Sequence, residues 1–213
     1  MSEQHPKNLL ILGAGLFAEE IADMVSEIEG FNLTAFVEGI DRDRCQTAVS
    51  GYPVIWVEDL GSHAGDAYGV CAVGSPKRKQ FVRRAAELGL RFTSVVHPTA
   101  HISLSSAIGS GTIVCPGCVV ASHTTIGENV IFNRGVLIGH HVTIGGFTTV
   151  SPGANVAGNV DIGEGAYIGM GANILDGITV GRHAVVGAGS VVTKDVPDSV
   201  QVVGVPAKIV KQL

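Results

Sequence analysis

Two adjacent histidines, His140 and His141, lie between two Ile-Gly pairs in the stretch VLIGHHVTIG, residues 136–145. Histidine is the usual side chain for proton transfer near neutral pH, because an unperturbed imidazole changes its charge between about pH 5 and 8. The pair therefore indicates either a site of acid–base chemistry or two solvated surface side chains. Its place in the fold decides which of these fits.

A six-residue repeat surrounds the pair. Every sixth position from Ile102 to Val192 is apolar, without an insertion, and glycine often follows it. A small or β-branched residue lies two positions earlier, as at Ala100, Ser106 and Thr112. A hexapeptide period predicts a parallel β-helix, in which three hexads make one triangular coil of 18 residues. We expect the glycines to serve turns where φ is positive.

The coil length places residues in columns. Residues 18 positions apart should stack about 4.8 Å from one another. His123 and His141 then share a column with Asn159, and His140 shares the adjacent column with Gly158. We therefore expect the histidine pair in a polar strip on the outside of the prism.

A separate α/β half-domain is expected over residues 1–95, before a β-helix over residues 96–213. The stretch NLLILGAGLFAEEIADMVSEI predicts a strand, a glycine turn and an amphipathic helix. Gly13, Gly15 and Ala18 fit the G-x-G-x-x-G/A pattern, and Glu38 follows a second strand, LTAFVEG. The pattern indicates either a plain tight turn or phosphate binding at a helix N-terminus.

The rest of this half-domain is shorter than a dinucleotide fold. A third strand, AYGVCAVG, leads into a helix from about Pro76 to Leu88, and RFTSVVHP predicts a fourth strand. These elements make half of a doubly wound, Rossmann-like domain. One nucleotide therefore fits better than NAD.

Composition and charge exclude several classes of protein. The chain has 213 residues with a net charge of −5, and phosphate backbones are bound by clustered Lys and Arg, so we expect no nucleic-acid partner. No apolar run reaches the roughly 18 residues of a membrane span. The N-terminal stretch MSEQHPKNLLILGAG lacks the pattern of a signal peptide. We expect a cytoplasmic protein.

One cysteine pair has spacing that could bind a metal. Cys115 and Cys118 form a single C-P-G-C, which resembles half of a zinc site or a redox pair, and no second pair completes it. The repeat gives Cys118 the role of a small inward-facing residue. We therefore expect no metal and no disulfide there.

The glycine-loop half-domain, the junction VVHPTA and the ending VVGVPAKIVKQL together resemble the NeuD/PglD type of sugar acetyltransferase, over nearly the whole chain. The resemblance implies a left-handed β-helix and a homotrimer. It implies transfer of acetyl from acetyl-CoA to a hydroxyl or amino group of a nucleotide-linked or sialic-acid-type sugar. The N-terminal domain would hold the nucleotide sugar, and acetyl-CoA would lie between neighbouring β-helices.

The resemblance also implies roles for single residues. His140 matches the general base, with His141 and Asn133 as the other catalytic positions. The positions implied to bind acetyl-CoA are Thr149, Gly158, Met170, Ala188 and Lys208. Those implied to bind the nucleotide sugar are Gly13, Ala14, Gly15 and Glu38.

The chemistry of acetyl transfer agrees with the roles implied for His140 and Gly158. A base must take the proton of the attacking acceptor, and a donor must hold the developing oxyanion. Neutral His140 suits the first task, and the backbone N–H of Gly158 suits the second, because glycine lets a ligand approach closely. No nucleophilic Cys or Ser is required.

The sequence departs from the family pattern at three places. Where the family has an acid or Asn, then His, then an acid, this chain has Gly139, His140 and His141. Thr149 replaces a histidine near the thioester, and Phe17 replaces a histidine near the sugar. His141 therefore stands where a carboxylate would support the base. A catalytically inactive sugar-nucleotide-binding protein is one alternative consistent with these departures.

A zinc enzyme is the other alternative. Trimeric β-helix proteins of the γ-class carbonic anhydrase type bind zinc through three histidines, and His123, His140 and His141 could supply them. The H-x4-H spacing of that class is absent, however, and the sugar domain and C-terminal ending favour the acetyltransferase.

Overall fold

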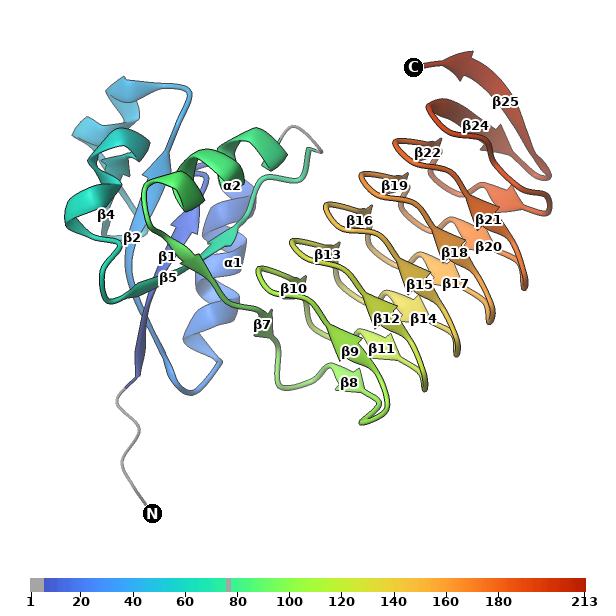
Figure 1. Ribbon diagram of the computed structural model, residues 1–213, viewed down its shortest axis with the longest axis horizontal. Helices are drawn as coiled ribbons and strands as arrows, with labels where there is room; N and C mark the ends of the chain where they lie inside the picture. Colours follow the sequence, from blue (N-terminus) through green and yellow to red (C-terminus); the bar gives the residue numbers. More distant parts are fainter. Residues whose placement is uncertain (1–5, 76–77) are drawn as a thin grey trace. The chain divides into compact units, whose positions relative to one another are not determined.

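The computed structural model describes residues 6–75 and 78–213 (Figure 1). The chain divides into two compact units, the first ending at His97 and the second running from Pro98 to Leu213. The predicted start of the second helix at Pro76, and the first five residues of the N-terminal stretch, lie outside the described residues. Within the described ranges, no helix is long and apolar enough to span a bilayer.

A mixed, mainly parallel sheet forms the centre of the first unit, with the strand order β3-β4-β2-β1-β5-β6. The central strand is buried from Leu9 to Leu12, which explains its continuous apolar sequence. The strands are β1 (Lys7–Leu12), β2 (Phe31–Glu38), β3 (Ala48–Val49), β4 (Tyr52–Trp56), β5 (Ala67–Cys71) and β6 (Arg91–Phe92).

Two α-helices and two short 3-10 helices complete the first unit. Their bounds are α1 (Leu16–Ser26), α2 (Arg78–Glu87), η1 (Arg42–Gln46) and η2 (Val57–Ser62). Helix α1 buries Ala18, Ile21, Ala22 and Val25, which recur at helical spacing along one face. Gly15 is its N-cap residue and provides no side-chain cap, so the glycine loop leads directly into exposed helix N–H groups.

Most of this unit follows the sequence-based expectation. Strands β1, β2 and β5 and helix α1 lie where they were predicted, and the predicted fourth strand is divided into β6 and β7 (Val95–Val96). The additional strands β3 and β4 were not predicted. Strand β4 pairs parallel to β2, so the sheet extends further than the expected half-domain.

The second unit is a left-handed β-helix of two-residue strands that ends in two longer, antiparallel strands, β24 and β25 (Figure 1). Face A contains β10 (Ile113–Val114), β13 (Ile131–Phe132), β16 (Thr149–Val150), β19 (Tyr167–Ile168), β22 (Val185–Val186), β24 (Val200–Gly204) and β25 (Ala207–Gln212). Face B contains β8 (His101–Ile102), β11 (Val119–Val120), β14 (Leu137–Ile138), β17 (Asn155–Val156), β20 (Asn173–Ile174) and β23 (Val191–Val192). Face C contains β9 (Ala107–Ile108), β12 (Thr125–Ile126), β15 (Thr143–Ile144), β18 (Asp161–Ile162) and β21 (Thr179–Val180).

The predicted register is confirmed along the β-helix. Each short strand ends on the predicted apolar position, and these side chains fill the interior from Val114 onward. Ile102 and Ile108 are half-buried, because they lie in the first coil and no earlier coil of this unit covers them. Strands pair with those 18 residues away, as Leu137 does with Asn155.

From Thr112 onward, the residues two positions before the apolar one are also buried. Thr124 donates its hydroxyl to the carbonyl of Gly139 at 2.9 Å, so the polar group is satisfied inside the corner. Cys118 is fully buried and its thiol lies 3.1 Å from the carbonyl oxygen of Asn133, the inward-facing role predicted for it. Burial raises the pKa of the Cys118 thiol.

The expectation of positive φ was wrong for the glycines that directly follow the apolar position, whereas other glycines of the β-helix turns, such as Gly111 and Gly135, do have positive φ. The glycines that follow the apolar position do not have positive φ. A Cβ on Gly139 would stand only 2.6 Å from the carbonyl carbon of Ala157 in the next coil, so these glycines allow the coils to stack closely. Positive φ occurs two residues later, at His141 (φ 56°) and Asn159 (φ 56°).

Candidate active site

The histidine pair occupies an exposed corner between faces B and C, directly after β14. Nδ1 of His140 lies 3.1 Å from Nδ1 of His141, and the two rings are nearly perpendicular at 85°. One of these nitrogens must donate a proton and the other must accept it. When His140 donates from Nδ1, its Nε2 carries a lone pair and can take a proton from a substrate.

The column predicted for His141 is confirmed. The rings of His123 and His141 have centroids 4.9 Å apart and are tilted by 41°. The backbone N–H of His141 donates to the carbonyl of Ser122 at 3.0 Å, one coil earlier. His141 therefore contacts both His123 and His140.

Gly158 lies in the column of His140, as predicted, and makes room for its ring. The position that a Cβ of residue 158 would occupy is 2.7 Å from Cε1 and 2.8 Å from Nε2 of His140. Any side chain at residue 158 would therefore displace the imidazole. The glycine leaves Nε2 of His140 next to bare backbone at the surface of the corner.

The other predicted residues of the β-helix do not reach this corner within one chain. Thr149 belongs to β16 of face A, and Asn133 directly follows β13 of the same face, where its Oδ1 accepts the backbone N–H of Arg134 at 2.8 Å. Met170 and Ala188 share one column at the corner between faces A and B, where the N–H of residue 189 donates to the carbonyl of Met170. Lys208 lies on β25, at the end of face A.

Face B separates these two corners and carries a shallow groove of about 350 Å³. Its floor is strands β14, β17 and β20, and it extends to Gly139 and Ala157, next to His140 and Gly158. The exposed side chains of Leu137 and Leu175 make the groove apolar. The apolar groove on face B therefore lies beside His140, the candidate base.

The first unit holds a larger cavity of about 820 Å³. All four residues that the resemblance implied for the sugar line it: Gly13, Ala14 and Gly15 from the loop before α1, and Glu38 from the end of β2. Gly13 has a φ of 106°, a region that L side chains rarely adopt, so the loop needs glycine there. The exposed N-terminus of α1 lies at the same cavity.

Glu38 helps to shape the cavity wall. It is buried, and its Oε1 accepts the backbone N–H groups of Gly39 and Ile40, both at 2.8 Å. The carboxylate therefore holds the loop after β2 in place. This leaves Oε2 as the oxygen that a ligand hydroxyl could approach.

Two arginines in the cavity were missed by the sequence analysis. Arg44 donates to the carbonyl of Ala14 at 3.0 Å, so its guanidinium lies at the glycine loop. Arg78 is 1% exposed, and burial lowers its pKa to about 10. Because that value is far above 7, Arg78 remains a cation, and a buried cation at a cavity wall favours an anionic ligand.

Aromatic residues complete the cavity and were also missed. Trp56, at the end of β4, and Phe81, on α2, both line it. The stretch YPVIW is a short apolar run before an acidic turn, which is typical of a strand. Its proline argued against a strand, so β4 was not predicted. Trp56 lies at the same cavity as the glycine loop because β4 pairs with β2. No sequence pattern indicated this pairing.

Two family models match the chain. The PglD N-terminal domain matches residues 8–85, and the bacterial transferase hexapeptide (six repeats) matches residues 159–194. A comparison with curated protein sequences found no match. The two matches agree with the division into a glycine-loop unit and a β-helix.

Solved structures match over almost the full length. A variant of perosamine N-acetyltransferase from Caulobacter crescentus, in complex with CoA and GDP-perosamine, is 31% identical with a TM-score of 0.89, covering 96% of this chain and 97% of that one. The chain belongs to the PglD-type sugar acetyltransferases. The family assignment confirms the resemblance inferred from the glycine loop and the hexad ending.

Two further members show the same architecture. The acetyltransferase domain of PglB from Neisseria gonorrhoeae FA1090, in complex with acetyl coenzyme A, is 33% identical with a TM-score of 0.87, covering 96% of this chain and 100% of that one. WeeI from Acinetobacter baumannii AYE is 32% identical with a TM-score of 0.85, covering 95% and 99% of the two chains. This PglD-type chain therefore shares both units with its relatives.

Proposed function

We propose that the protein transfers acetyl from acetyl-CoA to an amino or hydroxyl group of a nucleotide-linked or sialic-acid-type sugar. The observation that carries the proposal is the corner where Nε2 of His140 lies against Gly158 while Nδ1 contacts His141. The relatives in complex with CoA and GDP-perosamine or with acetyl coenzyme A support it. The name of the perosamine enzyme, an N-acetyltransferase, favours an amino group as the acceptor.

In the proposed reaction the acceptor attacks the thioester directly. Its nitrogen or oxygen bonds to the carbonyl carbon while Nε2 of His140 takes the proton. The carbonyl oxygen becomes an oxyanion, for which the backbone N–H of Gly158 is the proposed donor. When the intermediate collapses, the C–S bond breaks and the proton held by His140 goes to the leaving CoA thiolate.

The cavity of the first unit suits the nucleotide part of the acceptor. The proposed phosphate site is the N-terminus of α1 at Gly15, with Arg44 and Arg78 as cations. Oε2 of Glu38 is the proposed acceptor for a ribose hydroxyl. Trp56 offers an aromatic face to the base.

A homotrimer would complete the acetyl-CoA site. The residues implied to bind acetyl-CoA divide between the A–B corner, with Met170 and Ala188, and the B–C corner, with Gly158 beside His140. A closed three-fold assembly can place the A–B corner of one chain against the B–C corner of the next. This would also cover the apolar groove on face B.

No specific feature favours the two alternatives, an inactive sugar-nucleotide-binding protein and a zinc enzyme. Among the described residues, no three His, Cys, Asp or Glu side chains are grouped so as to hold a metal ion. The departures at His141, Thr149 and Phe17 leave the His140–Gly158 geometry intact. We therefore keep active acetyl transfer as the proposal.

Release of free thiol from acetyl-CoA in the presence of nucleotide-linked amino sugars tests the proposed function. We expect turnover with at least one such sugar and slower or no turnover with the corresponding free sugar. Acetyl-CoA binding is measured alongside by isothermal titration, and the zinc content of the protein is determined separately. Binding of a nucleotide sugar without acetyl-CoA binding or turnover would favour the inactive homologue, and stoichiometric zinc would favour the metal enzyme.

A further inference from the structure

The histidine pair lacks a negative charge next to it in sequence. Residues 139 and 141, which flank His140, are glycine and histidine. In the proposed mechanism His140 becomes an imidazolium when it takes the acceptor proton. A second imidazole can orient the ring of His140, but it cannot balance that positive charge.

The β-helix brings a carboxylate to His140 from two coils away. Asp176 is 36 positions after His140 and therefore lies in the same column, with Gly158 between them. The position that a Cβ of Gly158 would occupy is 2.8 Å from Nε2 of His140 and 3.1 Å from Oδ1 of Asp176. The two atoms are thus no more than about 6 Å apart, a range over which opposite charges stabilise one another.

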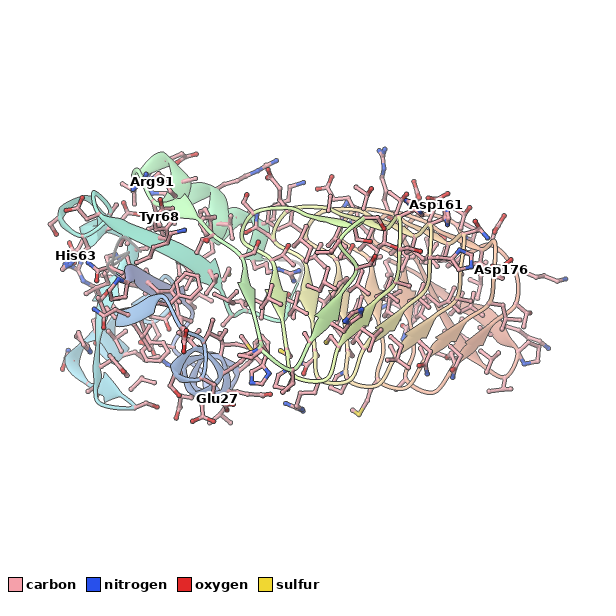
Figure 2. The ribbon with its side chains drawn as sticks, turned by 90° about the horizontal axis from the view of Figure 1, so that it is seen from below. Glu27, His63, Tyr68, Arg91, Asp161 and Asp176 are labelled. Carbon is pink, nitrogen blue, oxygen red and sulfur yellow. The ribbon has the colours of Figure 1, made fainter. Side chains whose placement is uncertain are left out.

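Other contacts show that Asp176 is held in place and its charge is available. Asn159 donates from Nδ2 to Oδ1 of Asp176 at 3.3 Å, which fixes the side chain beside the column of Gly158. Among the ion pairs of the described residues, none involves Asp176. Asp176 is exposed, so its carboxylate lies at the surface of the β-helix, and Figure 2 labels it.

We propose that Asp176 is a positioning residue for His140, supplying across Gly158 the negative charge that the neighbouring sequence lacks. The inference rests on the proposed role of His140 as the base. The carboxylate stabilises the imidazolium formed during acetyl transfer and keeps Nε2 directed over Gly158. Gly158 is essential to this arrangement, because a side chain there would stand between the two groups.

The test compares two charge-neutralising variants. Asp176→Asn keeps the size of the side chain and an oxygen for Asn159, so it removes only the charge. Asp161→Asn is the matched control, since Asp161 is an exposed aspartate on β18 of face C (Figure 2). We expect Asp176→Asn to lower kcat about tenfold, below the ~10²–10⁴ loss of a base itself, with the KM of both substrates unchanged. Asp161→Asn should retain wild-type turnover.

A double variant separates positioning from a structural effect. In the His140→Ala background, Asp176→Asn should cause no further loss, because the group on which the carboxylate acts is gone. An unchanged kcat in Asp176→Asn, an equal further loss in the double variant, or a loss confined to the KM of the sugar would overturn the inference. Full activity of His140→Ala alone would instead contradict the proposed function.

Discussion

At the scale of single residues, the backbone explains why two histidines can meet at this corner. Position 141 has a φ of 56°, and the same corner position carries His123, Asn159 and Gly177 in other coils. Asn, Gly and His are among the residues that tolerate this conformation. The left-handed turn places the ring of His141 beside that of His140, so the corner geometry itself produces the Nδ1–Nδ1 contact.

The two histidines should therefore respond differently to substitution. His141→Asn retains a residue suited to positive φ, so the corner should keep its shape and thermal stability. We expect its kcat to fall by less than that of His140→Ala, because an orienting partner contributes only part of the effect of a base. Steady-state kinetics on both variants measure this. If His141→Asn lost activity while His140→Ala kept near-normal turnover, the base would be His141 and not His140.

The sequence predicts the spatial neighbours of a residue where the six-residue repeat determines them. The columns of His140 and His141 could be predicted because the hexads run without insertion. Asp176 was missed, since the stretch LDGITV reads as an ordinary polar turn. Its closeness to His140 requires both the two-coil stacking and the absence of a side chain at Gly158.

At the scale of elements, the glycine loop before α1 assigns different roles to its glycines. A Cβ on Gly13 would lie 3.1 Å from Val73 and 3.3 Å from the carbonyl of Ala72, and its φ is 106°, so the fold requires this glycine. Gly15 has an ordinary φ of −98°, and the nearest atom to an added Cβ would be Nη1 of Arg44 at 4.0 Å. Gly15 is therefore free of packing constraints at the place proposed for the phosphates.

Gly15→Val is the variant that tests this loop. The fold has room for the larger side chain, whereas a phosphate at the N-terminus of α1 needs close approach to the backbone. We expect weaker nucleotide-sugar binding and unchanged acetyl-CoA binding by isothermal titration. Equal loss of both ligands, together with a lowered Tm, would indicate misfolding rather than a phosphate site.

The elements themselves were predicted unevenly. Uninterrupted hexads fix the β-helix, because a single period specifies every strand. The first unit has no such period, and its short strands β3 and β4 depend on tertiary pairing. The role of the repeat glycines that directly follow the apolar position was misjudged, since close contact between coils leaves the same sequence signal as a positive φ.

At the scale of the whole molecule, the proposed acetyl-CoA site is divided between two corners of the β-helix, and we therefore expect more than one chain to form it. Thr149, Met170 and Ala188 lie on face A or at its corner, away from His140. The apolar groove with Leu137 and Leu175 lies between them on face B. A symmetric assembly would bury this surface and unite the two halves of the site.

We expect a homotrimer, with three times the 22.0 kDa mass of the chain, in sedimentation equilibrium at micromolar concentration. Leu137→Glu should weaken the assembly and lower turnover together, because a charge would enter the covered surface. A monomeric mass in a fully active preparation would rule out a site shared between chains.

The turnover of His140→Ala with acetyl-CoA and an accepted nucleotide sugar tests whether His140 is the general base. We expect a kcat lowered by about 10²–10⁴, the usual contribution of a general base, with little change in acetyl-CoA affinity by titration. A kcat close to that of the unmodified protein would contradict this role, and the histidine pair would then be a feature of the surface alone.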